Sequence, residues 1–183
     1  SAAVTSADHT VTVVADGVTV SGKVRSYNPG NSVTVQLKQG DTEMYTATVT
    51  TPTAASGQTE QNFSISTVAP GIYDLVVTKK AHLPYTVKGV KVEGTDLDLT
   101  KHSNAAISTI TLLCGDIDGD GWIDFSDYQE LLKSTNYGKQ TSAVGVNKIA
   151  DLDGDTWIDF SDYQILLSSQ HYGKSTFSVS FAG

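Results

Sequence analysis

Hydrophobic and polar residues alternate with a period of two along most of the first 113 residues. This alternation, interrupted by Gly, Pro, Asn and Asp, predicts short β-strands joined by turns. The predicted strands lie at 9–14, 17–27, 31–39, 43–50, 61–67, 71–80, 83–93 and 107–113. Such a series of short strands predicts an antiparallel β-sandwich. The residues expected to face its core are Val24, Val33, Val35, Leu37, Phe63, Ile65, Tyr73, Leu75, Val77 and Val90.

The pattern changes at about Cys114. From there the period moves towards three or four, and aspartates replace threonines. Residues 116–139 align without gaps onto residues 151–174, and only six of the aligned positions differ. An internal repeat of this kind predicts two copies of one structural unit. We therefore expect one domain over residues 1–113 and a second domain over residues 114–183.

Each repeat opens with five aspartates at the spacing of a twelve-residue calcium loop. Positions 1, 3, 5, 9 and 12 supply side-chain oxygens, position 9 either directly or through water, and position 7 supplies a backbone carbonyl. The ligands predicted in the first loop are Asp116, Asp118, Asp120, Trp122, Asp124 and Asp127. The ligands predicted in the second loop are Asp151, Asp153, Asp155, Trp157, Asp159 and Asp162. The sequence thus predicts two bound Ca²⁺ ions, the alternative being two acidic surface turns without metal.

The charge of the chain supports the metal interpretation. Of the net charge of −8, the repeats account for most, because residues 114–183 contain four Lys and eleven Asp or Glu, which gives −7. An acidic excess of this kind is unfavourable for binding to nucleic acid or to anionic membranes, so neither partner is expected. Carboxylates crowded into a short loop repel one another unless a cation neutralises them. Two Ca²⁺ ions would change the net charge of residues 114–183 from −7 to −3.

Position 6 of each loop requires a positive φ, which Gly121 adopts readily and the β-branched Thr156 does not. We therefore expect the second loop to bind calcium less tightly than the first. Position 8 is Ile123 or Ile158, and these two residues are expected to pair with each other in a short strand contact between the loops. A helix is expected after each loop, with Ser126 or Ser161 as N-cap, Gln129 or Gln164 completing a capping box, and Gly138 or Gly173 as the stop.

A calcium-sensing EF-hand has a helix on both sides of its loop, but the residues before the first loop, 107–113, are predicted to form a strand. A loop followed by a helix, present twice, resembles the dockerin module of cellulosome-type complexes over roughly residues 114–175. The preceding sandwich is similar to the X-module of X-module–dockerin tandems, and residues 63–94 are similar to the carboxypeptidase-regulatory-like, immunoglobulin-like sandwich. The resemblance implies a two-domain fold, an all-β antiparallel sandwich followed by a small α-helical dockerin with duplicated calcium loops of the F-hand type.

The resemblance also implies a function. Dockerins are calcium-dependent modules that bind a cohesin domain of a scaffoldin or cell-surface anchoring protein, in extracellular, secreted or cell-surface bacterial complexes that degrade polysaccharides. In this family the partner-binding residues occupy loop positions 10 and 11 and one face of the following helix. The corresponding residues are Phe125, Ser126, Gln129, Leu132 and Lys133 in the first repeat, and Phe160, Ser161, Gln164, Leu167 and Ser168 in the second.

For several of these residues, the alternative to partner binding is a purely structural role. Ser126 and Ser161 serve as helix caps in that case, and Leu132 and Leu167 belong to the core. Exposed aromatic residues typically anchor interfaces, so the phenylalanines at position 10 are the strongest candidates for partner contacts. Because the repeats are nearly identical, a rotation of 180° would present almost the same surface. The sequence therefore predicts two docking orientations.

The sandwich is expected to stabilise the second domain or to extend its interface. The alternative is a carbohydrate-binding module for cellulose, xylan or starch, for which the sandwich offers only the tyrosines Tyr27, Tyr45, Tyr73 and Tyr85 as aromatic platforms. Catalysis is not expected, because no nucleophile elbow, His-rich metal motif or phosphate loop occurs. The four histidines are expected at the surface and Cys114 in the interior. The alternating tail 175–183 either folds back as a clasp on the second domain or leads away from it.

Overall fold

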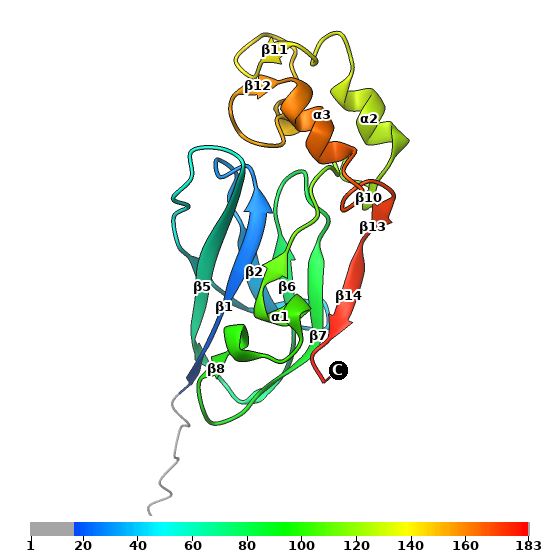
Figure 1. The fold of residues 1–183 in the computed structure, drawn as a ribbon. Coiled ribbons are helices and arrows are strands. Elements are labelled where there is room, and N and C mark those ends of the chain that lie inside the picture. Colours follow the sequence, from blue (N-terminus) through cyan, green and yellow to red (C-terminus); the bar gives the residue numbers. More distant parts are fainter. Residues whose placement is uncertain (1–16, 183) are drawn as a thin grey trace, which may run out of the picture.

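The structure is a computed structural model that describes residues 17–182, so the strand predicted at 9–14 and His9 lie outside the described residues. Two five-stranded sheets pack face to face, and the two repeats lie over one end of them (Figure 1). The first sheet has the order β4 (Thr48–Val49), β5 (Gln58–Val68), β1 (Val18–Tyr27) and β8 (Leu97–Asp98), with β9 (Ile110–Thr111) also paired to β1. The second has the order β14 (Phe177–Ser180), β7 (Tyr85–Val92), β6 (Gly71–Thr78), β2 (Thr34–Gln39) and β3 (Thr42–Thr46).

The alternation in the sequence places one face of each strand in a common core. All ten residues predicted to face this core are buried. The ring of Phe63 on β5 lies directly over Gly22 on β1, and a Cβ atom at Gly22 would be 2.5 Å from the ring. Glycine at this position is therefore required by the close approach of an aromatic side chain.

The strand predicted at 43–50 is divided between the two sheets. Its first part is β3 in the second sheet, and its last part is β4 in the first sheet. Ala47 lies between them and donates its N–H to the carbonyl of Val35 at 2.9 Å. The chain therefore passes from one sheet to the other within a single run of alternating residues.

The strand predicted at 107–113 begins instead as a helix. The 3₁₀ turn η1 (Leu99–Lys101) is followed by α1 (Ala105–Ser108), and only β9 remains extended. The side chain of Asn104 accepts a hydrogen bond from the N–H of Ala106 at 3.0 Å and so caps the short helix. This local side-chain bond competes with strand formation and replaces it here.

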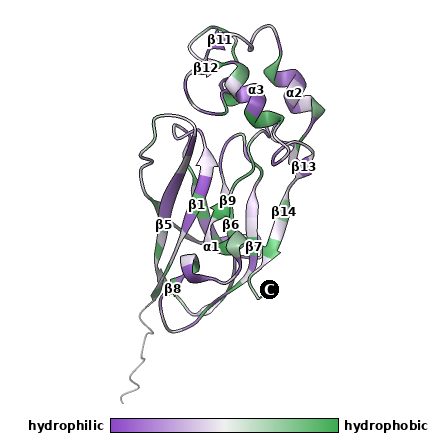
Figure 2. Ribbon diagram, viewed as in Figure 1, coloured by the Kyte–Doolittle hydropathy of each residue, from purple (hydrophilic) through white to green (hydrophobic). Residues whose placement is uncertain are grey.

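The repeats contain short elements. These are β10 (Trp122–Ile123), α2 (Phe125–Leu131), β11 (Lys139–Gln140), η2 (Lys148–Ala150), β12 (Trp157–Ile158), α3 (Phe160–Leu166) and β13 (Lys174–Ser175). Both seven-residue helices carry hydrophobic and hydrophilic residues side by side (Figure 2). No helix within residues 17–182 is long and apolar enough to cross a membrane.

The predicted pairing of Ile123 with Ile158 was wrong. Ile123 pairs with Lys174 in the antiparallel pair β10–β13, and Ile158 pairs with Lys139 in the equivalent pair β11–β12. The strand of each loop thus joins the segment that follows the helix of the other repeat. Two reciprocal pairs replace one direct contact, and they connect the repeats at two places instead of one.

The predicted fold class was also wrong. The sandwich is not purely antiparallel, because β8, β9 and β14 each join a neighbouring strand in parallel. Residues 114–182 do not form a separate small helical domain, since they contain only α2 and α3 as α-helices and their last strand, β14, belongs to a sheet of the sandwich. Strands dominate the described chain. The physical reason lies in the tail, whose alternating residues add strand β14 to the edge of the sheet beside β7 instead of packing on the helices.

A second core joins the repeats to the sandwich. Its buried residues are Ala81 and Leu83 from the sandwich and Cys114, Ile117, Ile123, Leu131, Ala150, Leu152, Ile158 and Leu166 from the segment that carries the repeats. The prediction that Cys114 is buried was confirmed, with an exposed fraction of zero. Burial raises the pKa of its thiol, which makes it an unreactive small hydrophobic residue.

Two of the histidines expected at the surface are buried at this junction. His82 accepts a hydrogen bond from the N–H of Tyr27 at 3.1 Å, and its Nδ1 lies 2.7 Å from the carbonyl of Lys80. Burial lowers the pKa of His82 to about 3, so the ring is neutral. His171 is buried with its ring edge-to-face against Tyr27, 5.7 Å between centroids.

The tail connects the end of the second repeat to the sandwich. Strand β14 pairs in parallel with β7, with Val179 opposite Val87 (Figure 1). Val179 and Phe181 are partly buried against the sandwich core, and Nε2 of His102 lies 3.1 Å from the carbonyl of Phe181. The tail therefore clasps the sandwich, so the alternative of a clasp on the second domain was wrong.

Phe181→Ala is expected to lower the free energy of unfolding by about 2 kcal/mol, roughly half the cost of truncating a fully buried phenylalanine. Ser180→Ala, at the neighbouring exposed position, is the matched control and should change the free energy of unfolding by less than about 0.5 kcal/mol. Urea unfolding of the three proteins measures both values. Equal stability of Phe181→Ala and the unmodified chain would show that the tail does not act as a clasp.

Candidate metal centres and an aromatic surface

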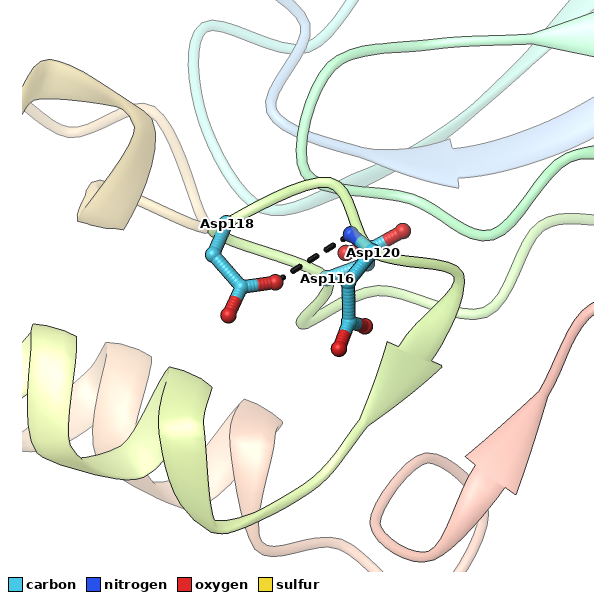
Figure 3. A group of neighbouring side chains, drawn as sticks. All are labelled: Asp116, Asp118 and Asp120. Atoms are coloured by element: carbon cyan, nitrogen blue, oxygen red, sulfur yellow. Dashed lines mark hydrogen bonds between the residues drawn. The ribbon is translucent and has the colours of Figure 1, made fainter.

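Each repeat brings three aspartates together. In the first repeat Asp116, Asp118 and Asp120 each offer an oxygen atom that lies within 4.8 Å of the other two (Figure 3). In the second repeat Asp151, Asp153 and Asp155 form the same group. The carboxylates at loop positions 1, 3 and 5 therefore form two triads with the same spacing.

Hydrogen bonds within the loops create this arrangement. In the first loop Asp116 accepts from the N–H of Gly119 at 2.8 Å, and Asp118 accepts from the N–H of Asp120 at 3.2 Å, the bond drawn in Figure 3. Asp120 accepts from the N–H of Trp122 at 2.8 Å. The equivalent distances in the second loop are 2.8, 3.0 and 2.7 Å. Short-range bonds of this type favour the winding of a loop through contacts within its own sequence.

The aspartate at position 12 holds the ends of each loop together. Asp127 is fully buried and accepts three backbone N–H bonds, from Ile117 at 2.6 Å, Asp118 at 3.2 Å and Asp124 at 2.9 Å. Asp162 makes the same three bonds in the second repeat, at 2.6, 3.2 and 2.8 Å. Because a carboxylate has about four acceptor positions, little of its capacity remains. Position 12 therefore lies outside the triad and acts on the loop backbone.

The predicted N-caps were wrong by two residues. Asp124 and Asp159 are the N-caps, and each forms a capping box with the aspartate three residues later. Ser126 instead donates to Asp118 at 2.7 Å and to Asp124 at 2.9 Å, whereas Ser161 donates to Asp159 at 2.8 Å. The predicted helix stops were also wrong, because α2 and α3 end at Leu131 and Leu166, and the glycines at 138 and 173 follow a further turn.

The electrostatics of the loops favour a bound cation. Burial raises the pKa of Asp127 to about 6 and that of Asp162 to about 7, and it also raises the pKa of Asp116 and of Asp151. Within residues 17–182 no ion pair involves a member of either triad. Three uncompensated carboxylates per loop are a donor set that suits a hard divalent cation such as Ca²⁺. The residues present therefore fit a metal ion in each loop.

The predicted carbonyl ligands, Trp122 and Trp157, lie on the two-residue strands that follow the triads. Their side chains are exposed, at 53% and 41%. Gly119 and Gly154 at position 4 both have a positive φ, +79° and +80°, which permits the turn. The prediction that position 6 also has a positive φ was confirmed, since Gly121 has a φ of +88° and Thr156 has a φ of +81°.

Four aromatic residues of the two helices form a continuous row. Phe125 stacks on Tyr128 with centroids 5.6 Å apart, and Phe160 stacks on Tyr163 at 5.7 Å. The two tyrosines contact each other at 6.1 Å and complete the row across both helices. Both phenylalanines are 58% exposed at its two ends. The two tyrosines are half-buried and also pack against the second core. Their spacing of three residues from a phenylalanine on the same helix is the sequence signal for a shared face.

The remaining residues predicted to contact a partner differ between the repeats. Ser126, Gln129 and Lys133 are exposed, and Leu132 and Leu167 are half-buried against the second core. In the second repeat Ser161, Gln164 and Ser168 face the sandwich. They line a shallow cleft of about 460 Å³ together with Tyr27, Gly57, Asp153 and Ile165. The two repeats are thus similar in sequence but unequal in their surroundings.

Thr156→Gly is expected to raise the affinity of the second loop for Ca²⁺ about tenfold, because glycine adopts a positive φ without the strain of about 1–3 kcal/mol that a β-branched residue has there. Isothermal titration calorimetry of both proteins measures the change. Gly121→Thr is the mirror-image control and should weaken the first loop by a similar factor. An unchanged affinity of the second loop in Thr156→Gly would contradict the strain at this position.

Two solved structures with the same fold belong to one type of complex. No family model matches the chain, and no curated protein matches it. A chain of an N-terminal interface mutant of the type II cohesin–X-dockerin complex from Acetivibrio cellulolyticus matches with a TM-score of 0.65 and 24% identity, over 87% of this chain and 98% of that chain. A C-terminal interface mutant of the same complex matches with a TM-score of 0.61 and 23% identity, over the same shares. The chain therefore shares its fold, over nearly the full length of the matched chains, with a component of cohesin–X-dockerin complexes.

Proposed function

We propose that the chain is a calcium-dependent protein–protein docking module of the dockerin type, which binds a cohesin and so assembles or anchors an extracellular polysaccharide-degrading complex. The observation that carries the proposal is the duplicated aspartate triad placed directly before two helices that share one aromatic row with an exposed phenylalanine at each end. The likeness in fold to chains of cohesin–X-dockerin complexes supports it. These complexes consist of interaction modules, so the proposed role is binding without catalysis.

Two Ca²⁺ ions would be held by the triads, with further oxygens from Asp124 and Asp159 at position 9 and from the tryptophan carbonyls at position 7. Asp127 and Asp162 at position 12 would each add the one acceptor position that their three backbone hydrogen bonds leave free. The bound ions supply positive charge that removes the repulsion among the loop carboxylates. The chain itself supplies the mechanical connection. Asp127 and Asp162 link each loop to the first turn of its helix, so the order of a loop fixes the direction of α2 or α3.

The partner would contact the aromatic row and the polar residues next to it. Phe125 and Phe160 project from its two ends, and large exposed aromatic residues at the centre of an interface contribute most of its binding energy. Ser126, Gln129 and Lys133 would form the polar rim on the side of α2. On the side of α3 the equivalent residues face the cleft beside the sandwich, so a partner there would contact both segments.

The proposed partner is a cohesin domain of a scaffoldin or cell-surface anchoring protein, outside a bacterial cell. Residues 114–183 would provide the docking surface, and residues 1–113 would support it. A polysaccharide-binding role of the sandwich has little support from its tyrosines. Tyr73 and Tyr85 are buried, Tyr45 packs edge-to-face on Tyr73, and Tyr27 packs on His171, so these rings do not form an open platform for a sugar.

Removal of calcium is expected to abolish binding to a type II cohesin, because the metal-free loops no longer hold both helices in place. The test is isothermal titration calorimetry with purified cohesin, first in millimolar calcium and then in excess chelator. Recovery of binding when calcium is restored is the control for irreversible unfolding. Equal affinity in calcium and in chelator would refute the calcium dependence, and no binding to any cohesin tested would refute the function.

Phe125→Ala alone should leave much of the affinity for cohesin, whereas Phe125→Ala combined with Phe160→Ala should lower it at least about 100-fold, as expected for the loss of two anchoring residues. Ile72→Ala, which changes a 64% exposed hydrophobic residue of the sandwich, is the matched control and should bind normally. Complete loss of binding in Phe125→Ala would contradict two docking orientations. Normal binding of the double variant would exclude the aromatic row as the interface.

A further inference from the structure

The sandwich contacts the second metal loop directly. Nδ2 of Asn28 donates a hydrogen bond of 2.7 Å to the backbone carbonyl of Asp151, at loop position 1. The N–H of Gly57 donates a bond of 2.6 Å to the backbone carbonyl of Asp153, at loop position 3. Asn28 and Gly57 are joined in turn, because the N–H of Asn28 donates to the carbonyl of Gly57 at 3.1 Å. Two linked residues of the sandwich therefore hold the main chain of two triad members.

The contact is built into the fold. Asn28 is 93% buried, since only 7% of its surface is exposed, and its φ of +55° aims the side chain at the loop from the end of β1. Its Oδ1 packs so closely on Gly154 that a Cβ atom there would lie 2.6 Å away. Gly57 has a φ of +77°, a conformation that suits glycine. Both residues thus adopt backbone conformations that serve this contact.

The first metal loop has no such support. Within residues 17–182 no hydrogen bond from the sandwich reaches the backbone carbonyl of Asp116 or Asp118, and the space around Gly119 is open. The loop without these two bonds is the one with Gly121 at position 6, where the carbonyl accepts a bond of 2.9 Å from the N–H of Thr176 in the tail. The supported loop is the one in which Thr156 adopts a φ of +81°. Support from the sandwich and backbone strain therefore occur in the same loop.

We propose that Asn28 and Gly57 are positioning residues for the second metal site, which keep its loop in the metal-binding conformation despite the strain at Thr156. The proposal rests on calcium binding as set out above. The two bonds fix the main chain at positions 1 and 3, so the carboxylates of Asp151 and Asp153 are ordered before the ion arrives. Preorganisation of this kind raises affinity by lowering the cost of ordering upon binding. Occupancy of the second site must in return stabilise the sandwich loops that carry Asn28 and Gly57, because coupling is reciprocal.

The test is a calcium titration of the full ¹⁵N-labelled chain in chelator-buffered calcium, followed by NMR. The amides of Gly119 and Gly154, at position 4 of the two loops, report each site separately. Asn28→Gly tolerates the positive φ but lacks the donor, and it should weaken the second site about five- to tenfold while leaving the first site unchanged. Asn28→Asp keeps the shape and replaces the donor with an acceptor, so it should weaken the second site further. Asn31→Ala, in the same turn, is the matched control and should leave both sites unchanged.

Hydrogen exchange gives a second measurement that a merely structural role would not change. In the unmodified chain, calcium should slow exchange of the Gly57 amide, and in Asn28→Gly this slowing should be smaller. Equal weakening of both sites, or an unchanged second site in both Asn28 variants, would overturn the proposal while calcium binding stands. Failure of the unmodified chain to bind calcium at either loop would overturn the proposed function and the positioning role together.

Discussion

Each repeat depends on one buried carboxylate. Asp127 and Asp162 accept backbone N–H bonds from the start of the loop and from the residue that caps the following helix. A buried carboxylate with a raised pKa is costly to keep charged, and those backbone donors offset part of this cost. The same three bonds make loop and helix one mechanical unit. Binding of a cation to the triad can therefore affect a helix surface that the ion does not touch.

The second constraint is the unequal environment of two almost equal repeats. Three of the six differing positions reflect this environment: Glu130, Lys133 and Asn136 in the first repeat correspond to Ile165, Ser168 and His171 in the second. Glu130 and Lys133 form an ion pair at an open surface. Ile165 and Ser168 line the cleft beside the sandwich, and His171 packs on Tyr27. The substitutions therefore match the repeat that faces the sandwich, where an unpaired charge would be costly to bury.

The second core and the tail clasp reinforce this asymmetry. Ala81 and Leu83 of the sandwich share a hydrophobic cluster with residues of both repeats, and β14 extends a sheet of the sandwich beyond β7. A rotation of 180° that exchanges the repeats would not exchange these attachments. The two repeats are consequently alike in their aromatic rings and different in what lies beside them.

The ten core positions of the sandwich, the triads and the positive φ at Thr156 could be predicted from the sequence. All of these depend on local rules, namely the two-residue period of a strand and the hydrogen bonds of a short loop with its own backbone. The caps were misplaced by two residues because aspartate and serine are both good caps, and only the bonds made by Asp124 and Asp159 distinguish them. The aromatic row was missed in part because its central contact, Tyr128 on Tyr163, joins two helices.

Only the tertiary structure decided how the segments are assembled. The pairing of Ile123 with Lys174, the parallel addition of β14 to β7 and the contact of Asn28 with the second loop all join residues far apart in the chain. Several partners of similar chemistry compete for each of these places, and the sequence alone does not rank them. The sequence by itself determined what each loop and strand is. The packing of the whole chain determined which repeat meets the sandwich, because that choice depends on the sum of contacts across the junction and on no single residue.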